Sequence, residues 1–416
     1  MNQDLSWDEA ITEKLNSKFG FEKFDPKKVS LSFEEKKNLF SHFVESFEKK
    51  EIKIITVAGT NGKGETARTI ARELSKNGKN CGLWTSPHVL SVRERFIFKE
   101  EMISKNQFEK LLEQVPLLSF YESLFYLFCL WIDQREKVDF LILEVGLGGR
   151  LDATNFFDTD LACLTSISKD HCEILGDTHS LILKEKLGIT RETAPLISCL
   201  TSDFLNSEIK EFTSKAKINW INLKESVPEL RKLPYWEQNT LTALTAVNLI
   251  LQGIENLKIP NKNELPPPES SPGRFEQMTL KNRGFIFIGA HNLDGLRHLV
   301  QSVFGRIKGE QEIETLFALS DRPLEEVSSM MDVILTCPRL AKKAWVCEFN
   351  HPRALSSEKL FSLFEQREKN GKENIRFAKD WAKQIQNEST GTTLVLGSYY
   401  FIGEVQKLLL SLSRTS

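Results

Sequence analysis

The residues with the clearest chemical potential lie in a short glycine-rich segment. Gly59, Thr60, Asn61, Gly62, Lys63 and Gly64 follow an apolar run that begins at Lys53 and precede a segment of helical composition that begins at Thr66. Glycines let a backbone turn tightly and bring N–H groups against phosphate oxygens, and a helix N-terminus and a lysine add positive charge. A strand, a glycine loop and a helix in this order predict a phosphate-binding site. The less favoured alternative is a tight turn with a solvated lysine.

The loop departs at two positions from the spacing G-x-x-x-x-G-K-[ST] that is typical of phosphate-binding loops. Val57 stands where the first glycine belongs, and Glu65 stands where a Ser or Thr offers a hydroxyl to Mg²⁺. A carboxylate can bind Mg²⁺, but it also repels a triphosphate. Alternatively, Thr66 takes over the role of the hydroxyl. The sequence leaves these two alternatives open.

Three further segments place metal-ligating residue types at the ends of predicted strands. Ser86 lies in TSPH, Glu144 in LEVGLGGRLD and His171 in SKDHCEILGD. Ligands gather at the carboxyl ends of parallel strands, so a hydroxyl, a carboxylate and an imidazole are expected beside the phosphates. With ATP oxygens and water, they would complete the six ligands of Mg²⁺. Each residue alone is a weak indication of a metal site, and their occurrence together in this order strengthens the prediction.

Strands that alternate with helices must position these residues. We expect strands over 53–59, 80–86, 138–144 and 161–167, and a buried helix over 119–134. The proline-rich segment 266–273 is the predicted linker, because three prolines in a row continue neither a helix nor a central strand. After it we expect strands over 284–289, 314–320, 333–337, 344–349 and 392–397, and helices from Asp294 and Leu324. The pattern predicts two α/β domains, residues 1–270 and 271–416.

Composition excludes several classes of protein. The 416 residues contain 55 Lys and Arg and 57 Asp and Glu, a formal net charge of −2, which argues against a strongly basic nucleic-acid binder. The most apolar stretch, 117–132, contains Glu122 and is shorter than the roughly 20 residues of a membrane span. Seven scattered cysteines without C-x-x-C spacing indicate reduced thiols. We expect a cytoplasmic protein with neither nucleic-acid nor membrane partners.

Eight segments together carry a resemblance to a known family. From about Lys53 to the C-terminus the chain contains, in order, TVAGTNGKG, TSPH…RERF, LEVGLGGRLDATN, DHCEILGDT, KEKLGI, PGRFE, GAHN and LGSYYFIGEV. On these motifs the chain resembles the bifunctional dihydrofolate synthase/folylpolyglutamate synthases of the Mur-type ligase family. The resemblance implies an α/β fold with an N-terminal P-loop ATPase domain on a mostly parallel sheet. A smaller C-terminal Rossmann-like α/β domain would follow, with the active site between the two.

The activity that this resemblance implies is ATP-dependent amide formation. The carboxylate of dihydropteroate, or the γ-carboxylate of a reduced folate, takes the γ-phosphoryl group of ATP, and the amine of L-glutamate attacks the acyl phosphate. The implied partners are these small molecules, the implied cofactors are ATP and two Mg²⁺ ions, and the chain is expected to be a monomer. Which acceptor is preferred stays open.

The resemblance also implies roles for single residues. Ser86, Glu144 and His171 match Mg²⁺ ligands, and Lys186 in KEKLGI matches a lysine that the family carbamylates to help hold the second metal ion. Asn239 and Arg274 match nucleotide contacts and, with residues 59–66, form the predicted nucleotide site. His291 in GAHN matches a histidine that faces the cleft, and Lys63, Lys186 and His291 are the predicted catalytic residues.

Four positions depart from the family pattern. Glu65 replaces a serine, Ile288 replaces an aspartate before GAHN, Leu293 replaces a proline after it, and Leu187 replaces an alanine. These departures keep two alternatives open: a monofunctional member, and a catalytically weakened paralogue that binds folate or nucleotide without turnover. A P-loop hydrolase or kinase unrelated to ligation would not account for GAHN or PGR.

Overall fold

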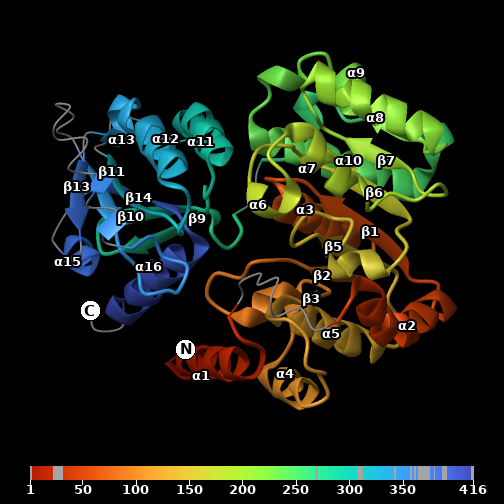
Figure 1. Ribbon diagram of the computed structural model, residues 1–416, viewed down its shortest axis with the longest axis horizontal. Coiled ribbons are helices and arrows are strands. Elements are labelled where there is room, and N and C mark those ends of the chain that lie inside the picture. Colours follow the sequence, from red (N-terminus) through yellow and green to blue (C-terminus); the bar gives the residue numbers. More distant parts are fainter. Residues whose placement is uncertain are drawn as a thin grey trace. The chain divides into compact units, whose positions relative to one another are not determined.

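The computed structural model describes residues 2–21, 31–267, 270–306, 313–341, 343–356, 358–359, 362–363, 375–378, 380–386 and 391–413. The chain divides into two compact units, Met1–Pro268 and Glu269–Ser416, each built around its own sheet (Figure 1). In these ranges no helix combines the length and the apolar character that a membrane crossing requires. All seven cysteines are free thiols.

The described part of the first unit alternates strands and helices. Its strands are β1 (Lys53–Ala58), β2 (Cys81–Trp84), β3 (Phe96–Phe98), β4 (Glu101–Met102), β5 (Phe140–Glu144), β6 (Leu161–Leu164), β7 (Leu196–Ser198) and β8 (Trp220–Asn222). Its α-helices are α1 (Asn2–Phe19), α2 (Phe33–Lys49), α3 (Lys63–Lys76), α4 (Lys105–Leu112), α5 (Phe120–Asp133), α6 (Cys172–Leu175), α7 (His179–Leu187), α8 (Asp203–Lys215), α9 (Leu223–Ser226) and α10 (Tyr235–Gln252).

The strands of this unit form one sheet in the order β4-β3-β2-β5-β1-β6-β7-β8. In this order the neighbouring strands from β2 to β8 are parallel. At the other edge of the sheet, β3 is antiparallel to both β2 and β4. The four contiguous strands β2, β5, β1 and β6 therefore end at the same edge of the sheet. The mostly parallel sheet that the sequence predicted is confirmed, and its carboxyl edge gathers the motifs that follow these strands.

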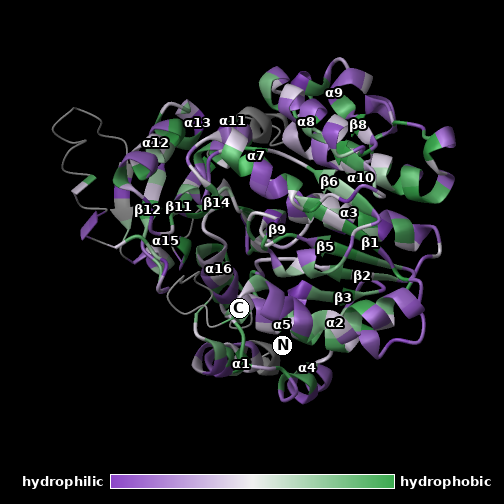
Figure 2. Ribbon diagram, turned by 45° about the vertical axis from the view of Figure 1, so that its right-hand side comes forward, coloured by the Kyte–Doolittle hydropathy of each residue, from purple (hydrophilic) through white to green (hydrophobic). Residues whose placement is uncertain are grey.

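Helices cover both faces of this sheet, as a parallel sheet requires. Along β1, Ile54 packs into the core that contains α2 and α5, whereas Ile55 and Val57 pack into the core that contains α3 and α10. This alternation follows from the two-residue period of a strand. Figure 2 shows β1 and β2 in mainly hydrophobic colours, which fits strands that are buried on both sides.

Helix α5 confirms the buried helix predicted for the most apolar stretch. Ser119 caps its N-terminus, and the side chain of Glu122 returns to the Ser119 backbone to complete a capping box. The Glu122 carboxylate also forms an ion pair of 2.8 Å with Lys36 of α2. A carboxylate within an apolar helix is tolerated here because it is both capped and paired. Phe40 and Phe43 of α2 and Phe125 of α5 are fully buried, so much of the phenylalanine surplus fills this core.

The second unit contains a six-stranded sheet in its described residues, in the order β13-β12-β11-β14-β10-β9. The strands are β9 (Arg274–Leu280), β10 (Arg283–Ile288), β11 (Ile313–Ala318), β12 (Ala344–Cys347), β13 (Ile375–Ala378) and β14 (Gly391–Gly397). The helices are α11 (Leu293–Arg306), α12 (Leu324–Leu335), α13 (Pro338–Ala341), α15 (Trp381–Gln386) and α16 (Tyr399–Leu412). All neighbouring strands are parallel except β9 against β10.

Two expectations about local structure were wrong. The strand expected over 333–337 is the last part of α12 and the turn after it. Val327, Met330, Met331 and Ile334 are buried at helical spacing, so the apolar run belongs to a helix face. Helix α3 begins at Lys63 rather than at Thr66, because Gly62 adopts a left-handed conformation (φ 84°) and caps the helix directly after the turn.

Candidate active site

The glycine loop lies at the carboxyl end of β1, one of the two inner strands of the four that end together. Gly62 precedes α3, so Lys63, Gly64 and Glu65 form the first turn of that helix. The first amides of a helix have no partner within the helix, and they carry the positive end of its dipole. The loop and the start of α3 therefore present N–H groups that suit an anion such as a phosphate.

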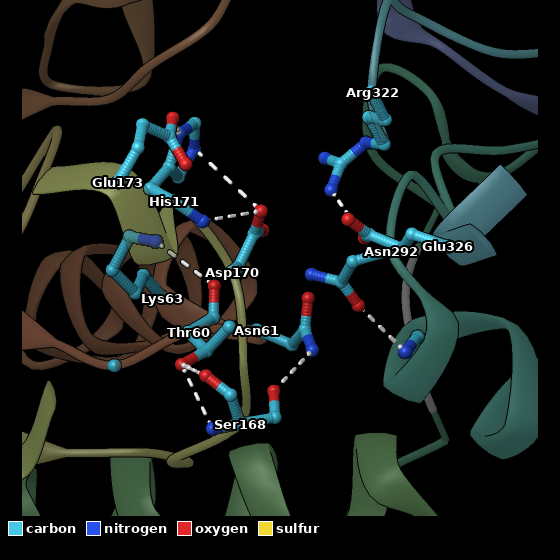
Figure 3. A network of polar contacts seen from close by, with 12 residues as sticks. Thr60, Asn61, Lys63, Ser168, Asp170, His171, Glu173, Asn292, Arg322 and Glu326 are labelled. Carbon is cyan, nitrogen blue, oxygen red and sulfur yellow. Dashed lines mark hydrogen bonds and ion pairs between the residues drawn. The ribbon is translucent and has the colours of Figure 1, made fainter. Parts of the chain in front are cut away.

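A second loop, which follows β6, holds the glycine loop in place. Thr60 N donates to Ser166 O (2.8 Å), and Thr60 Oγ1 exchanges hydrogen bonds with the backbone of Ser168 (3.0 and 3.1 Å; Figure 3). Thr165 Oγ1 and Ser166 Oγ donate to Asn61 O at 2.7 and 3.0 Å. These bonds occupy polar groups of the loop backbone and fix its shape. The sequence did not single out the segment 165–168, since its role depends on β6 lying beside β1.

Two lysines reach the carbonyl groups of the same loop. Lys63 Nζ donates to Thr60 O at 3.1 Å, and Lys186 Nζ, from α7, donates to Gly59 O at 2.9 Å. Lys186 is only 4% exposed. Burial, and then the nearby charge of Lys63, lower the pKa of Lys186 to about 7 from its ordinary value of 10.5, against opposite effects of Asp170 and Asp152. A buried lysine with a lowered pKa therefore contacts the backbone of the glycine loop.

Ser86 and Glu144 lie together at the ends of β2 and β5. Ser86 N donates to Glu144 Oε2 at 2.9 Å, and both residues are buried. The two strands are neighbours, with Trp84 opposite Leu143, so this contact follows from the register of the sheet. A buried carboxylate and a hydroxyl supply the hard oxygen ligands that Mg²⁺ prefers.

His171 stands at the N-terminus of α6 in a left-handed conformation (φ 52°), an uncommon position for a residue that is not glycine. Its backbone N–H donates to Asp170 Oδ1 at 3.0 Å. Its imidazole lies 3.8 Å from Asp170 Oδ1 and 3.9 Å from Glu173 Oε1 (Figure 3). Asp170 is buried, whereas the side chain of His171 is 43% exposed. These contacts place His171 with two acidic residues that the sequence reasoning missed, although both lie within the DHCE motif.

The described residues include no group of three or more His, Cys, Asp and Glu side chains that could hold a metal ion. Oxygen ligands from hydroxyl groups are nevertheless available. Thr66 Oγ1, in the first turns of α3, is buried and has no hydrogen-bond partner among the described residues. An unsatisfied buried hydroxyl is costly. Like the Ser86 hydroxyl and the Glu144 carboxylate, the Thr66 hydroxyl is an oxygen donor of the kind that a divalent cation binds.

Glu65 and Asn239 form a hydrogen bond between α3 and α10. Asn239 Nδ2 donates to Glu65 Oε2 at 2.7 Å, and Asn239 is 2% exposed. The structure thus places Asn239 beside the first turn of α3, whereas its predicted contact with the nucleotide stays a prediction. Its partner there is Glu65, one of the four residues that depart from the family pattern.

The loop after β5 is organised by Asp152, a further residue that the sequence reasoning missed. Its carboxylate accepts hydrogen bonds from Gly146 N and Leu147 N (both 3.0 Å), from both the N–H and the hydroxyl of Thr154, and from Tyr121 OH (3.2 Å). This set shapes the GLGGRLDAT segment directly after Glu144. The signal was present in the sequence, because an Asp six residues after a strand-end Gly can cap the intervening turn.

In the second unit, three residues lie at the ends of neighbouring strands. His291 follows β10, Tyr399 follows β14, and Arg274 begins β9 opposite Ile288. The Arg274 guanidinium lies 5.2 Å from the Tyr399 ring centroid, and the rings of His291 and Tyr399 are 5.7 Å apart. Gly289 packs against the Tyr399 ring so closely that a Cβ there would lie 2.3 Å from it. Tyr399 therefore connects two predicted site residues, and the sequence alone did not indicate this.

Asn292 immediately precedes α11 in the same unit. Its side-chain oxygen accepts a hydrogen bond from Gly295 N at 2.8 Å, and it is fully buried. Ile288, the last residue of β10, occupies the position at which the family pattern has an aspartate. Asn292 thus fixes where α11 begins, directly after His291, and so it helps to set the position of the histidine.

A comparison with protein-family models finds no match for the chain. Among curated proteins, the chain is 32% identical over 322 residues to the dihydrofolate synthase/folylpolyglutamate synthase of Buchnera aphidicola subsp. Schizaphis graminum, a match that covers 72% of this chain and 75% of that protein.

Two solved structures share the fold over nearly the whole chain. One is Escherichia coli FolC in complex with DHPP and ADP, 23% identical, with a TM-score of 0.73 and coverage of 98% of both chains. The other is the bifunctional folylpolyglutamate synthase/dihydrofolate synthase of Yersinia pestis complexed with AMPPNP and Mn ion, 25% identical, with a TM-score of 0.73 and coverage of 97% and 98%. By its sequence relatives and its fold, the chain belongs to the dihydrofolate synthase/folylpolyglutamate synthase family.

Proposed function

We propose that the chain is an ATP-dependent ligase that joins L-glutamate to dihydropteroate, to the γ-carboxylate of reduced folates, or to both. Membership of the family supports this reaction type. The observation that carries the proposal is the phosphate loop itself. It is held by the segment after β6 and faced by Lys63 and Lys186, and the strand-end pair Ser86–Glu144 lies at the same sheet edge. The Escherichia coli relative was solved with DHPP and ADP, and the Yersinia pestis relative with AMPPNP and Mn ion.

The chain's own groups suit the transfer of a phosphoryl group to a carboxylate. A carboxylate is a poor electrophile until it carries a leaving group, so the γ-phosphoryl group must move to it first. This step needs positioning and charge neutralisation more than covalent catalysis. The backbone N–H groups of the loop and α3 bind and orient the phosphates, and the Lys63 ammonium neutralises part of their charge. The amine of glutamate then attacks the acyl carbon, and phosphate leaves.

The residues for a divalent cation are Ser86 and Glu144, with Thr66 as a further hydroxyl and His171 as the predicted imidazole ligand. Their oxygen-rich chemistry fits Mg²⁺. When bound, such an ion screens the charge of the phosphates and polarises the phosphoryl group. The buried, unsatisfied hydroxyl of Thr66 supports this assignment, because it has no other partner among the described residues.

Lys186 fits carbamylation, which would supply a ligand for a second Mg²⁺ ion. Only a neutral amine attacks carbon dioxide: its nitrogen lone pair forms the C–N bond, and the nitrogen then releases a proton to water. A pKa of about 7 leaves a large neutral fraction at physiological pH. The product is an anionic carbamate, which exchanges a buried cation for a carboxylate-like group beside the loop.

We assign residues 1–270 to ATP and folate binding and residues 271–416 to glutamate ligation, with a monomer as the active species. In the second unit, Arg274 and His291 are the candidate contacts of nucleotide and substrate. Their common packing against Tyr399 supports a shared role. Arg274 supplies a fixed positive charge, and His291 is the candidate group that moves or holds a proton during amide formation.

The test is phosphate release from ATP with dihydropteroate and with reduced folates, each with and without L-glutamate. We expect glutamate-dependent release with at least one acceptor, together with a product one glutamate heavier by mass spectrometry. Phosphate release that is indifferent to glutamate would contradict ligation. The second candidate is a weakened paralogue, which Glu65 and Ile288 favour. It predicts nucleotide binding without release under any of these conditions.

A further inference from the structure

Glu65 and Asn239 join the phosphate loop to a helix that lies 174 residues further along the chain. Glu65 is in the first turn of α3, and Asn239 is in the first half of α10. The hydrogen bond from Asn239 Nδ2 to Glu65 Oε2 is 2.7 Å long, and Asn239 is almost completely buried. A hydrogen bond to an ionised carboxylate is roughly twice as strong as one between neutral groups. This contact is therefore a strong link between α3 and α10.

The same asparagine also packs against the second glycine of the loop, Gly62. A Cβ on Gly62 would lie 2.3 Å from Asn239 Oδ1, and Gly62 is in a left-handed conformation that favours glycine. One end of the Asn239 amide thus contacts the loop at Gly62, while the other end holds the first turn of α3 at Glu65. Between these two contacts lie Lys63 and Gly64, whose amides suit phosphate binding.

We propose that Glu65 is a positioning residue: through Asn239 it holds residues 62–65 in the conformation that binds the nucleotide phosphates. The inference rests on the proposed nucleotide-binding function of this loop. It gives Glu65 a role other than metal ligation, and it gives Asn239 the role of a brace of the loop. Two features stabilise the Glu65 carboxylate at the phosphate site. It lies in the first turn of α3, where the helix dipole favours a negative charge, and it accepts a hydrogen bond from the buried Asn239 amide.

The decisive experiment reverses the direction of the hydrogen bond. Asn239→Asp removes the donor and brings two carboxylates together, so it should weaken nucleotide binding. The double variant Asn239→Asp/Glu65→Gln restores a donor on the opposite side, because the Gln amide can donate to the Asp carboxylate. Binding of ADP and of a non-hydrolysable ATP analogue is measured by calorimetry, and KM for ATP and kcat are measured by glutamate-dependent phosphate release. Thermal unfolding of each variant reports on folding.

We expect Asn239→Asp to raise Kd and KM for nucleotide about tenfold or more, with a smaller change in kcat, as the loss of one strong hydrogen bond would produce. The double variant should regain most of that affinity. The Mg²⁺ concentration for half-maximal binding should be the same in Glu65→Gln as in the unsubstituted protein, because Glu65 is not a metal ligand. Asn248→Asp is the matched control on α10; Asn248 bonds to Lys258 O, and its substitution should leave nucleotide affinity unchanged.

Two results would overturn the inference. If the double variant binds nucleotide no better than Asn239→Asp, then the hydrogen bond between residues 65 and 239 does not hold the loop in its binding conformation. If Glu65→Gln raises the Mg²⁺ requirement severalfold, then Glu65 is a metal ligand. Failure of the proposed function gives a different result, because the unsubstituted protein would then show no glutamate-dependent phosphate release, whatever its affinity for nucleotide.

Discussion

Lys186 should form a carbamate near neutral pH, and its surroundings give the size of the effect. Its ammonium group is buried behind the phosphate loop, where Nζ donates to Gly59 O. Burial and the charge of Lys63 lower its pKa to about 7. The neutral fraction of a lysine rises with pH and reaches one half at the pKa. At pH 7 about half of the Lys186 side chains would be neutral, compared with about 3 in 10,000 for a lysine of pKa 10.5. The reactive form is thus enriched by about 1,500-fold.

The perturbation is the removal of either the amine or its charged neighbour. Lys186→Arg keeps a positive charge but cannot form the carbamate. Lys63→Met removes the second-largest cause of the lowered pKa of Lys186, so it should raise that pKa and reduce the neutral fraction at pH 7. Lys184→Arg is the matched control, because Lys184 is exposed on the same helix, α7.

The assay is carbon-13 NMR in labelled carbon dioxide and bicarbonate, with dissolved carbon dioxide held constant from pH 6 to pH 8. We expect a carbamate resonance that grows as pH rises through 7. The signal should be absent in Lys186→Arg, retained in Lys184→Arg and weaker at pH 7 in Lys63→Met. The reasoning is refuted if no resonance depends on Lys186 at pH 7 to 8, with or without Mg²⁺ and ATP. It is also refuted if Lys63→Met leaves the pH dependence unmoved, because the lysine pair would then not be coupled.

Three further changes test other parts of the site. Lys63→Ala should abolish turnover while circular dichroism and thermal unfolding remain those of a folded protein; an unchanged rate would mean that the loop is not the phosphate site. Thr66→Val keeps the shape of the side chain and removes a buried hydroxyl without a partner, so the melting temperature should stay equal or rise, while affinity for Mg²⁺-nucleotide should fall about tenfold. Unaltered affinity would exclude that hydroxyl from the site. Asp152→Ala leaves several buried or partly buried donors without an acceptor and should lower the free energy of unfolding by about 3 kcal/mol, measured in urea. A loss below about 1 kcal/mol would show that water replaces the carboxylate.

The order of strand, glycine loop and helix was predictable from the sequence because its determinants are local. A β-branched run, three glycines within six residues and a following helix dictate a strand, a turn and an N-terminus, wherever they occur. The structure places β1, the loop and α3 in that order. The same local logic failed over 333–337, where a short apolar run fits a strand or a buried helix equally well. Packing of Met330, Met331 and Ile334 into the core decided for the helix.

The candidate residues at the strand ends could also be predicted from the sequence, but not all of their contacts could. Ser86 and Glu144 could be paired in advance, because parallel strands end at one edge and both residues follow such strands. For His171 the residue was evident from the sequence, but its contacts with Asp170 and Glu173 were not, because the left-handed turn at the start of α6 sets the direction of the side chain.

The sequence by itself determined the family, the alternation of strands and helices, and the residue types that a ligase of this kind needs. Only the tertiary structure decided which of those side chains are buried, which have a shifted pKa and which form hydrogen bonds with one another. Lys186 has its low pKa because folding removes it from water beside Gly59, 127 residues away, and Glu65 meets Asn239 because α3 packs on α10. Spacing along the chain is fixed by the sequence, whereas burial and long-range hydrogen bonds arise only when distant segments are packed together.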